Sequence, residues 1–234
     1  MKIILLLYII IGFCTYGFAE DLPFKEKEIL SFSIEMFGMK IGNQTIAARL
    51  LSGSQTLQLI SETRTTLFAS RIYKLHNKIE THISMKNLLP VYIKNQIQEG
   101  KYSKNWTAEL DQRNHLGTIT LARLGDERKR ITIPTNTINI PALIYYLRAI
   151  KLNPHCSFSF ALLSEGNIEE ITVRVEKQEM VRVPYGDFFT LKVIESSGVV
   201  VIWFTNDENQ LPLKIARQTN AGWLKAELVG VKRD

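Results

Sequence analysis

Cysteine is scarce in this chain of 234 residues, which contains only Cys14 and Cys156. Two cysteines exclude the dense disulfide framework on which many small secreted domains depend. No Pro/Gly/Ser-rich linker, low-complexity segment or internal repeat divides the sequence. A chain of this length can bury a sizeable hydrophobic core without cross-links, so we expect a single domain after the N-terminal segment.

Long hydrophobic runs are also missing. The apolar run from Ile3 to Cys14 is shorter than the ~20 residues of a membrane helix; Lys2 precedes it, and the small-x-small site Gly17-Phe18-Ala19 follows it. This pattern is typical of an export signal, and a single-pass anchor is the weaker alternative. We expect residues 1–19 to be cleaved and residues 20–234 to be soluble. Because cleavage would remove Cys14, Cys156 would have no internal disulfide partner.

Neither sign of charge dominates. The chain has 29 Lys and Arg against 23 Asp and Glu, and loss of Lys2 would leave 28 − 23 = +5. The densest cluster, Asp126–Arg130, mixes both signs and is predicted to form a solvated hairpin tip. We therefore expect no nucleic-acid partner.

Alternation of apolar and polar residues is the main pattern that is present. It predicts half-buried strands, for example at 31–36, 91–97 and 171–176, and glycine-containing turns recur between them. The spacing indicates about a dozen strands joined as hairpins. The predicted fold is mainly β: one large curved antiparallel sheet, an open or half-closed barrel, with one short helix packed on its concave side.

The helix is predicted at Asn139–Ile150, with an asparagine cap, a proline in the first turn, and Leu143, Tyr146, Leu147 and Ile150 on one face. The strand at Val199–Phe204 is apolar at every position, so both of its faces need cover. Either the helix packs on the second face, or a hydrophobic ligand does.

Chemical motifs are sparse. His76, Glu80 and His82 share one face of a predicted strand, but His76 and His82 would lie about 20 Å apart, too far for one metal ion. His155 and Cys156 are adjacent and would point to opposite faces, so a buried, inert cysteine is expected. No hydrolase, zinc-protease or phosphate-loop motif is present. We predict no catalytic residue, no metal ligand and no cofactor.

Candidate ligand-binding residues come from the helix and the apolar strand. They are Tyr146, Leu147, Arg148, Trp203 and Phe204. The apolar run predicts that Trp203 is largely buried. For Arg148 two interpretations remain open: a solvated side chain at the helix end, or a functional one at a cavity rim that meets an anionic head group or an internal carboxylate.

Seven segments, taken in order, resemble the exported bacterial family catalogued as domain of unknown function 3108. These are residues 22–42, 68–84, 88–105, 141–154, 181–193, 201–215 and 222–229. The family usually has glycine where this chain has Lys27. It often has glycine where this chain has Pro154-His155. The resemblance implies a largely antiparallel β protein of the Gram-negative cell envelope, in the periplasm, with no established activity and no catalytic residues to transfer. Its recurrent positions are Glu99-Gly100, Tyr102, Arg148, Trp203, Asp207 and Pro212.

Three functions follow as hypotheses. The first is a non-enzymatic periplasmic module that binds a lipid, another amphiphile or an envelope component. The second is a scaffold or assembly factor that pairs with a partner protein through an exposed strand edge. The third is a hydrolase acting on envelope polymers. A carrier should have a roomy apolar cavity, a scaffold a filled interior, and a hydrolase a polar cleft.

Overall fold

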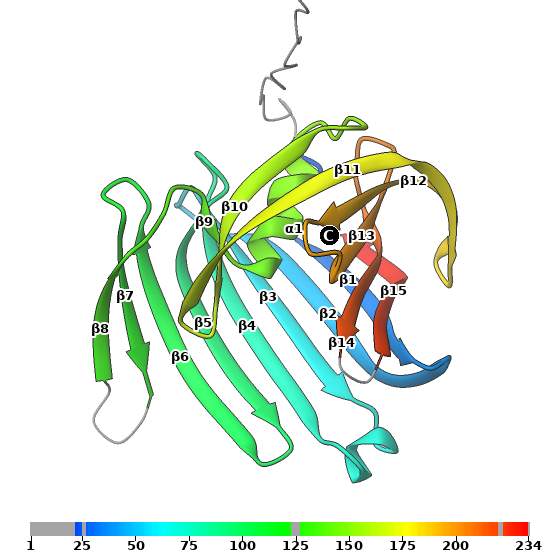
Figure 1. Ribbon diagram of the computed structural model, residues 1–234, viewed down its shortest axis with the longest axis horizontal. Coiled ribbons are helices and arrows are strands. Elements are labelled where there is room, and N and C mark those ends of the chain that lie inside the picture. The colour runs from blue at the N-terminus through cyan, green and yellow to red at the C-terminus, as the bar shows by residue number, and fades with distance from the viewer. Residues whose placement is uncertain (1–21, 25–26, 123–126, 220–221, 234) are drawn as a thin grey trace, which may run out of the picture.

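The computed structural model describes residues 22–24, 27–122, 127–219 and 222–233. These residues build one 15-stranded sheet that is curled around a single α-helix (Figure 1). The first half of the sheet contains β1 Glu28–Met36, β2 Met39–Leu50, β3 Thr56–Thr65, β4 Leu75–Ser84, β5 Pro90–Glu99, β6 Tyr102–Asp111, β7 Leu116–Leu121 and β8 Glu127–Thr132. The second half contains β9 Thr137–Ile138, β10 Ser157–Ser164, β11 Asn167–Val183, β12 Gly186–Glu195, β13 Val200–Thr205, β14 Pro212–Thr219 and β15 Gly222–Arg233.

Strand order follows the chain in two runs that meet at the termini. β1 pairs with both β2 and β15, whereas β8 and β9, which are consecutive in sequence, form the two edges of the sheet. All pairs are antiparallel except β9 with β10, between which the helix intervenes. The predicted curved antiparallel sheet is confirmed, although it has more strands than the dozen expected.

Alternation places one face of each strand inside the curve. In β5, Ile93 and Ile97 are buried while Lys94 and Gln96 are exposed, as the period of two predicts. The tight β1–β2 turn shows how the hairpins close, because Phe37 and Gly38 both have positive φ, of 52° and 75°. Two such residues form the turn whose twist matches that of the flanking strands.

Helix α1, Ile140–Ala149, lies within one residue of its predicted bounds. The Asn139 side chain accepts a hydrogen bond from the Ala142 amide at 3.3 Å and donates one to the Thr81 hydroxyl at 2.7 Å, which anchors the helix start to β4. Only Ile140 is exposed and only Tyr146 is half-buried. The helix is therefore enclosed by the sheet, rather than laid on it with one wet face.

Two hydrophobic cores result. The larger joins α1 to the concave sides of both halves of the sheet. The smaller forms where the β10–β11 hairpin folds over β5–β7, with Leu163 packed near Trp106 and Ile119. At the hairpin tip, the Lys104 ammonium donates to the Glu165 carbonyl at 2.9 Å. The sheet is thus half-closed by side-chain packing, while its two edges stay unpaired with each other.

Two other predictions concern the N-terminal segment and the connection before β8. Residues 1–19, the predicted signal peptide, lie outside the described residues. The predicted hairpin tip at Asp126–Arg130 is wrong for residues 127–130, which belong to strand β8. Among the described residues, no helix combines the length and apolar character needed to cross a bilayer.

Candidate functional site

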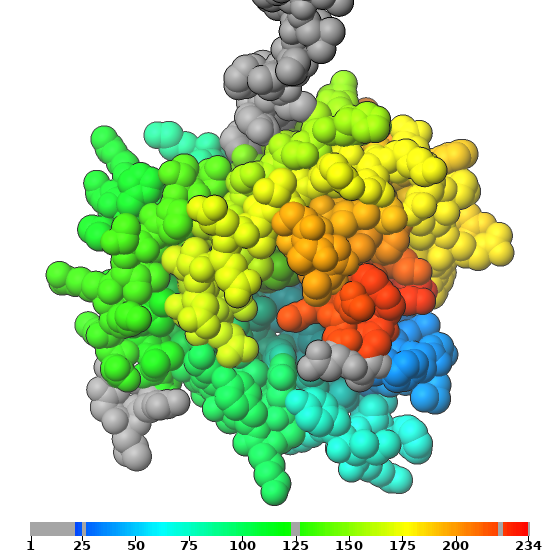
Figure 2. Space-filling model, viewed as in Figure 1, coloured from blue at the N-terminus to red at the C-terminus, as the bar shows by residue number. Residues whose placement is uncertain are grey.

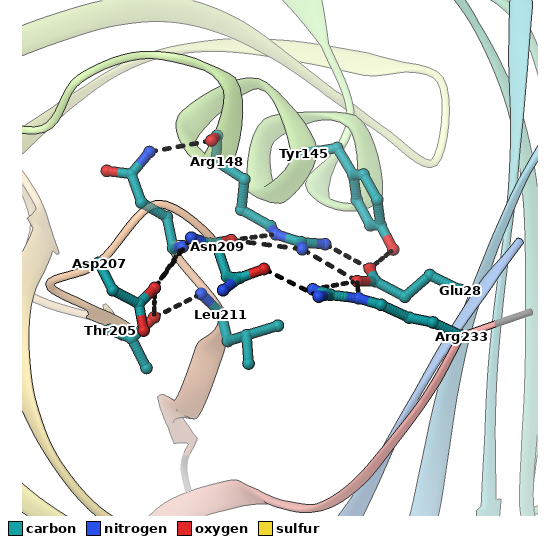
Figure 3. Close-up of polar contacts among 9 residues, drawn as sticks. Glu28, Tyr145, Arg148, Thr205, Asp207, Asn209, Leu211 and Arg233 are labelled. Carbon is teal, nitrogen blue, oxygen red and sulfur yellow. Dashed lines mark hydrogen bonds and ion pairs between the residues drawn. The ribbon is translucent and has the colours of Figure 1, made fainter. Parts of the chain in front are cut away.

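The carboxylate of Glu28, at the start of β1, is buried. It lies beside α1 at one end of the sheet (Figure 3). The guanidinium of Arg148 donates two hydrogen bonds to this carboxylate, from Nη1 to Oε1 at 2.6 Å and from Nη2 to Oε2 at 3.1 Å. Arg233, from the end of β15, donates Nε to Oε2 at 3.0 Å, and the Tyr145 hydroxyl donates to Oε1 at 3.0 Å. Both carboxylate oxygens are therefore fully engaged. We call Glu28, Tyr145, Arg148 and Arg233 the Glu28 network.

Charge balance explains why this network survives burial. Glu28 and Arg148 are each 1% exposed, and an isolated charge in such a place would be strongly destabilising. Burial alone would raise the pKa of Glu28, but the hydrogen bonds and charge of Arg148, aided by Arg233 and Tyr145, hold it below its ordinary value of 4.5. Burial also raises the pKa of Tyr145 above its ordinary value of 10.0, so its hydroxyl stays protonated and donates.

Aromatic rings enclose the Arg148 guanidinium. Its carbon lies 4.8 Å from the ring centre of Tyr145 and 5.3 Å from that of Phe24, distances at which a cation is attracted to an aromatic face. The prediction that Arg148 is solvated is wrong. The structure shows its contact with an internal carboxylate, whereas a functional role for Arg148 at a cavity rim stays a prediction.

The β13–β14 loop completes the arrangement. Asp207 shapes the loop by accepting hydrogen bonds from the Thr205 hydroxyl and from the amides of Asn209 and Gln210. The Gln210 amide group then caps the end of α1, with Nε2 at 2.9 Å from the Arg148 carbonyl and 2.7 Å from that of Ile150, which satisfies acceptors that a helix end leaves free. The Glu28 network and this loop therefore fix the helix in place.

The five predicted ligand-binding residues do not converge. Leu147 and Phe204 are fully buried in the larger core, where they pack on the same side of the sheet. Tyr146 is half-buried, with its ring edge against Phe160 at 5.2 Å between centres. Arg148 belongs to the Glu28 network. The side chains of Leu147 and Arg148 are enclosed by packed protein atoms.

Trp203 lies on the opposite face of β13. Its neighbour Phe204 belongs to the concave core, and adjacent strand residues point to opposite sides. The indole nitrogen donates to the Glu179 carboxylate, and the ammonium groups of Lys192 and Lys214 lie 6.0 and 5.6 Å from the ring centre. Trp203 is half-buried, so it is less buried than Phe204 on the concave face. Core packing covers one face of the apolar strand, and side chains of neighbouring strands cover the other.

A hollow remains on the concave face away from α1. Figure 2 shows it between the yellow β10–β11 hairpin and the orange-to-red β13 and β14 strands, with teal atoms of the β3–β4 region at its floor. Residues on this part of the concave face are half-buried or buried and mix polar and apolar character. They are Gln44, Ser61, Thr63, Asn77, Ile79, Asn95 and Ile97 on strands β2–β5, and Val200 and Ile215 on β13 and β14.

Some polar side chains of this group already have hydrogen-bond partners within the protein. Gln44 donates to the Ser61 hydroxyl at 3.1 Å, and Asn77 donates to the Glu99 carboxylate at 2.6 Å. The buried Oδ1 of Asn95 has no hydrogen-bond partner, although buried acceptors are nearly always paired. This part of the concave face therefore combines apolar contact surface with polar groups that are largely engaged within the protein.

The two strand histidines, His76 and His82, lie on the convex face. His76 pairs with Glu62 and His82 with Glu80, each at 2.8 Å. Within the described part of the chain, no group of three or more His, Cys, Asp or Glu side chains could hold a metal ion. Cys156 is buried, as expected.

Sequence reasoning missed the partners of Arg148. Glu28 and Arg148 are separated by 120 positions, and no local pattern connects them. The one available signal was a charged residue inside an otherwise apolar helix, with no acidic residue in the helix itself.

Comparison with known proteins agrees with this fold. No curated protein matches the chain. A solved structure described as a β-barrel-like protein of domain of unknown function DUF1849 from Brucella abortus superposes with a TM-score of 0.58 at 11% identity, covering 89% of this chain and 98% of that one. That likeness concerns the fold alone. A family model described as "Protein of unknown function (DUF3108)" matches residues 31–229, and the chain belongs to that family.

Proposed function

We propose that this protein is an exported, non-enzymatic module of the cell envelope that binds an amphiphile in the hollow on the concave face, away from α1. The observation that carries the proposal is the mixed lining of the hollow, in which Ile79, Val200 and Ile215 accompany Gln44 and Ser61. An amphiphile matches such a lining because binding sites bury apolar surface around a few oriented polar groups.

The helix does not form a lid over the hollow. Leu147 is fully buried and Arg148 is locked by Glu28, so α1 is a fixed part of the core. The ligand then lies between the β3–β5 wall and the β13–β14 wall.

Binding is tested with a fluorescent fatty-acid probe and by native mass spectrometry of protein isolated from the envelope. We expect saturable probe binding and a retained lipid. Ile79→Trp should fill the hollow and abolish binding with little loss of stability, because Ile79 is only half-buried. Lys94→Trp adds the same ring to the exposed face of the adjacent strand and should bind like wild type. Failure of the wild type to bind, or equal binding by both variants, would contradict the proposal.

Export is tested separately by cell fractionation. The sequence pattern of residues 1–19 supports a periplasmic form that begins near Glu20. A membrane-embedded chain that still carries Met1 would refute export.

Strand addition at β8 is the second candidate function. This edge strand is exposed from Glu127 to Arg130, and an exposed edge offers backbone groups to a partner strand. Its consecutive charges oppose pairing with a neutral or basic strand, so the partner should be acidic. A photo-crosslinker at Lys129 that captures an envelope protein, when one at Lys94 does not, would support this alternative.

A further inference from the structure

Large apolar side chains are exposed at the end of the sheet opposite the Glu28 network. Glu28 begins β1, and the β1–β2 turn lies at its other end, roughly 25 Å away at ~3.3 Å per residue. Two neighbouring chain reversals, β1–β2 and β3–β4, carry these side chains. We define the apolar rim as Phe37, Met39, Leu67, Phe68, Ile72 and Tyr73.

The exposure is unusually high for residues of this kind. Leu67 is 91% exposed, Phe68 76% and Ile72 85%. Single exposed apolar residues need no explanation, but a contiguous group of them marks a surface that meets a partner or a membrane.

The rim is held in shape by hydrogen bonds. The short 3-10 helix Ala69–Arg71 begins with the Ala69 amide donating to the Thr66 hydroxyl, and the Tyr73 amide closes it on the Ala69 carbonyl at 2.9 Å. The Thr66 amide bonds the Ile41 carbonyl at 2.9 Å, which joins the β3–β4 connection to β2. Its apolar side chains are therefore presented outward by an ordered backbone.

Tyr73 extends the rim to the next hairpin. A Cβ placed on Gly100, in the β5–β6 turn, would lie 3.3 Å from the Tyr73 ring. The ring therefore packs against the bare backbone of Gly100, where φ is also positive at 59°. Three adjacent reversals thus share one edge of the molecule, the lower end of β1–β6 in Figure 1.

Exposed charge on these reversals is positive. Lys40, Arg71, Lys74 and Lys101 are all exposed. Of the nearby acids, Glu35 is half-buried and Glu99 accepts a hydrogen bond from Asn77. Apolar side chains flanked by cations complement an anionic bilayer, where the apolar groups enter the interface and the cations remain among the phosphates.

We propose that the apolar rim docks on an anionic phospholipid surface. Leu67, Phe68 and Ile72 insert into the interface, while Arg71 and Lys74 contact lipid phosphates. The docking surface is separate from the hollow and requires no bound amphiphile.

The test is flotation of the protein, isolated after export, with vesicles of phosphatidylethanolamine containing phosphatidylglycerol and with vesicles of phosphatidylcholine. The wild type should float with the anionic vesicles, and added salt should weaken its binding. Leu67→Ser/Phe68→Ser/Ile72→Ser should lower the partition constant by roughly tenfold or more, since one inserted large apolar side chain is worth about that factor.

Two further variants act as controls. Met180→Ser/Phe189→Ser removes a cross-strand pair of exposed apolar residues elsewhere on the sheet and should float like wild type. Arg71→Glu/Lys74→Glu should lose the preference for anionic vesicles. Unfolding midpoints are compared first; if the triple variant unfolds earlier, Leu67→Ser alone replaces it.

Three results would overturn the docking proposal: no flotation of the wild type, equal flotation of the rim variant, or capture by an envelope protein without vesicle binding. Flotation needs no probe or ligand, so its failure would leave amphiphile binding in the hollow standing, and the reverse also holds.

Discussion

Arg148 contributes to stability mainly through what its loss would leave behind. Without its guanidinium, the buried Glu28 carboxylate would keep Arg233 as a cationic partner. Breaking a buried ion pair typically costs about 3–5 kcal/mol because one charge stays desolvated. We expect Arg148→Met to lower the free energy of unfolding by about that amount, measured by urea denaturation.

The double variant separates pairing from packing. Glu28→Leu/Arg148→Met removes both charges and should be more stable than Arg148→Met alone, because nothing buried is left unpaired. Arg233→Gln is the matched control: its side chain is 42% exposed, so about 1 kcal/mol or less is expected. A double variant no better than the single would show that the two residues are not coupled.

Trp203 and Phe204 offer a comparison on one strand. Phe204 is fully buried in the concave core, so Phe204→Ala should cost about 3–5 kcal/mol. Trp203 is half-buried on the other face, so Trp203→Ala should cost clearly less. Chemical denaturation of both variants measures the difference. A larger loss for Trp203→Ala would contradict the assignment of faces.

The sequence signals at Trp203 and Arg148 are incomplete for the same reason. An unbroken apolar run shows that two faces are covered, but does not show how completely each one is. A helical stripe shows which face is most apolar, but does not show that Arg148 on another face meets Glu28 from a distant strand.

At the scale of elements, α1 is a core helix rather than a lid. Leu147 has no exposed surface, and overpacking of a filled core typically costs about 1–3 kcal/mol. We expect Leu147→Trp to be destabilised by that amount in thermal or urea unfolding, with probe binding in the hollow unaffected in the folded fraction. Loss of binding without loss of stability would instead place the ligand beneath the helix.

Local patterns were sufficient to predict most elements. Alternation identified strands such as β5 and β11, and the Asn139 cap with Pro141 located α1 to within a residue. Charge favours solvent and therefore predicts a turn at residues 127–130, but an exposed edge strand meets that condition equally well. The hollow could not be predicted, since it depends on how far the β10–β11 hairpin folds over β5–β7.

At the scale of the whole molecule, the Glu28 network connects the first and last strands of the sheet in chain order. β1 and β15 are neighbouring strands, and Glu28 near the start pairs with Arg233 near the end. Arg148 adds the helix, and the Asn209 side chain accepts from Arg233 at 2.8 Å to add the β13–β14 loop. Protonation of one carboxylate should therefore affect global stability.

The direction of this pH dependence follows from the pKa of Glu28. Folding holds that pKa below its ordinary value of 4.5 through Arg148, Arg233 and Tyr145, despite the opposing effect of burial. The unfolded chain therefore binds a proton first as the pH falls. Stability from this group is fully present above about pH 4.5 and is lost progressively below it, as the pH approaches the folded pKa.

We expect the free energy of unfolding of the wild type to fall below pH 4.5, with Glu28 contributing a slope of at most about 1.4 kcal/mol per pH unit. Glu28→Gln should be less stable at neutral pH but should lose stability less steeply in acid, because its amide does not titrate. Glu62→Gln is the control. The pKa of Glu62 is also lowered, chiefly by its hydrogen bond to His76, but its side chain is 27% exposed on the convex face, so solvent screening should leave a smaller change in slope. Urea denaturation across this pH range measures all three proteins. If the Glu28→Gln curve ran parallel to that of the wild type, the acid sensitivity would arise from carboxylates outside the Glu28 network.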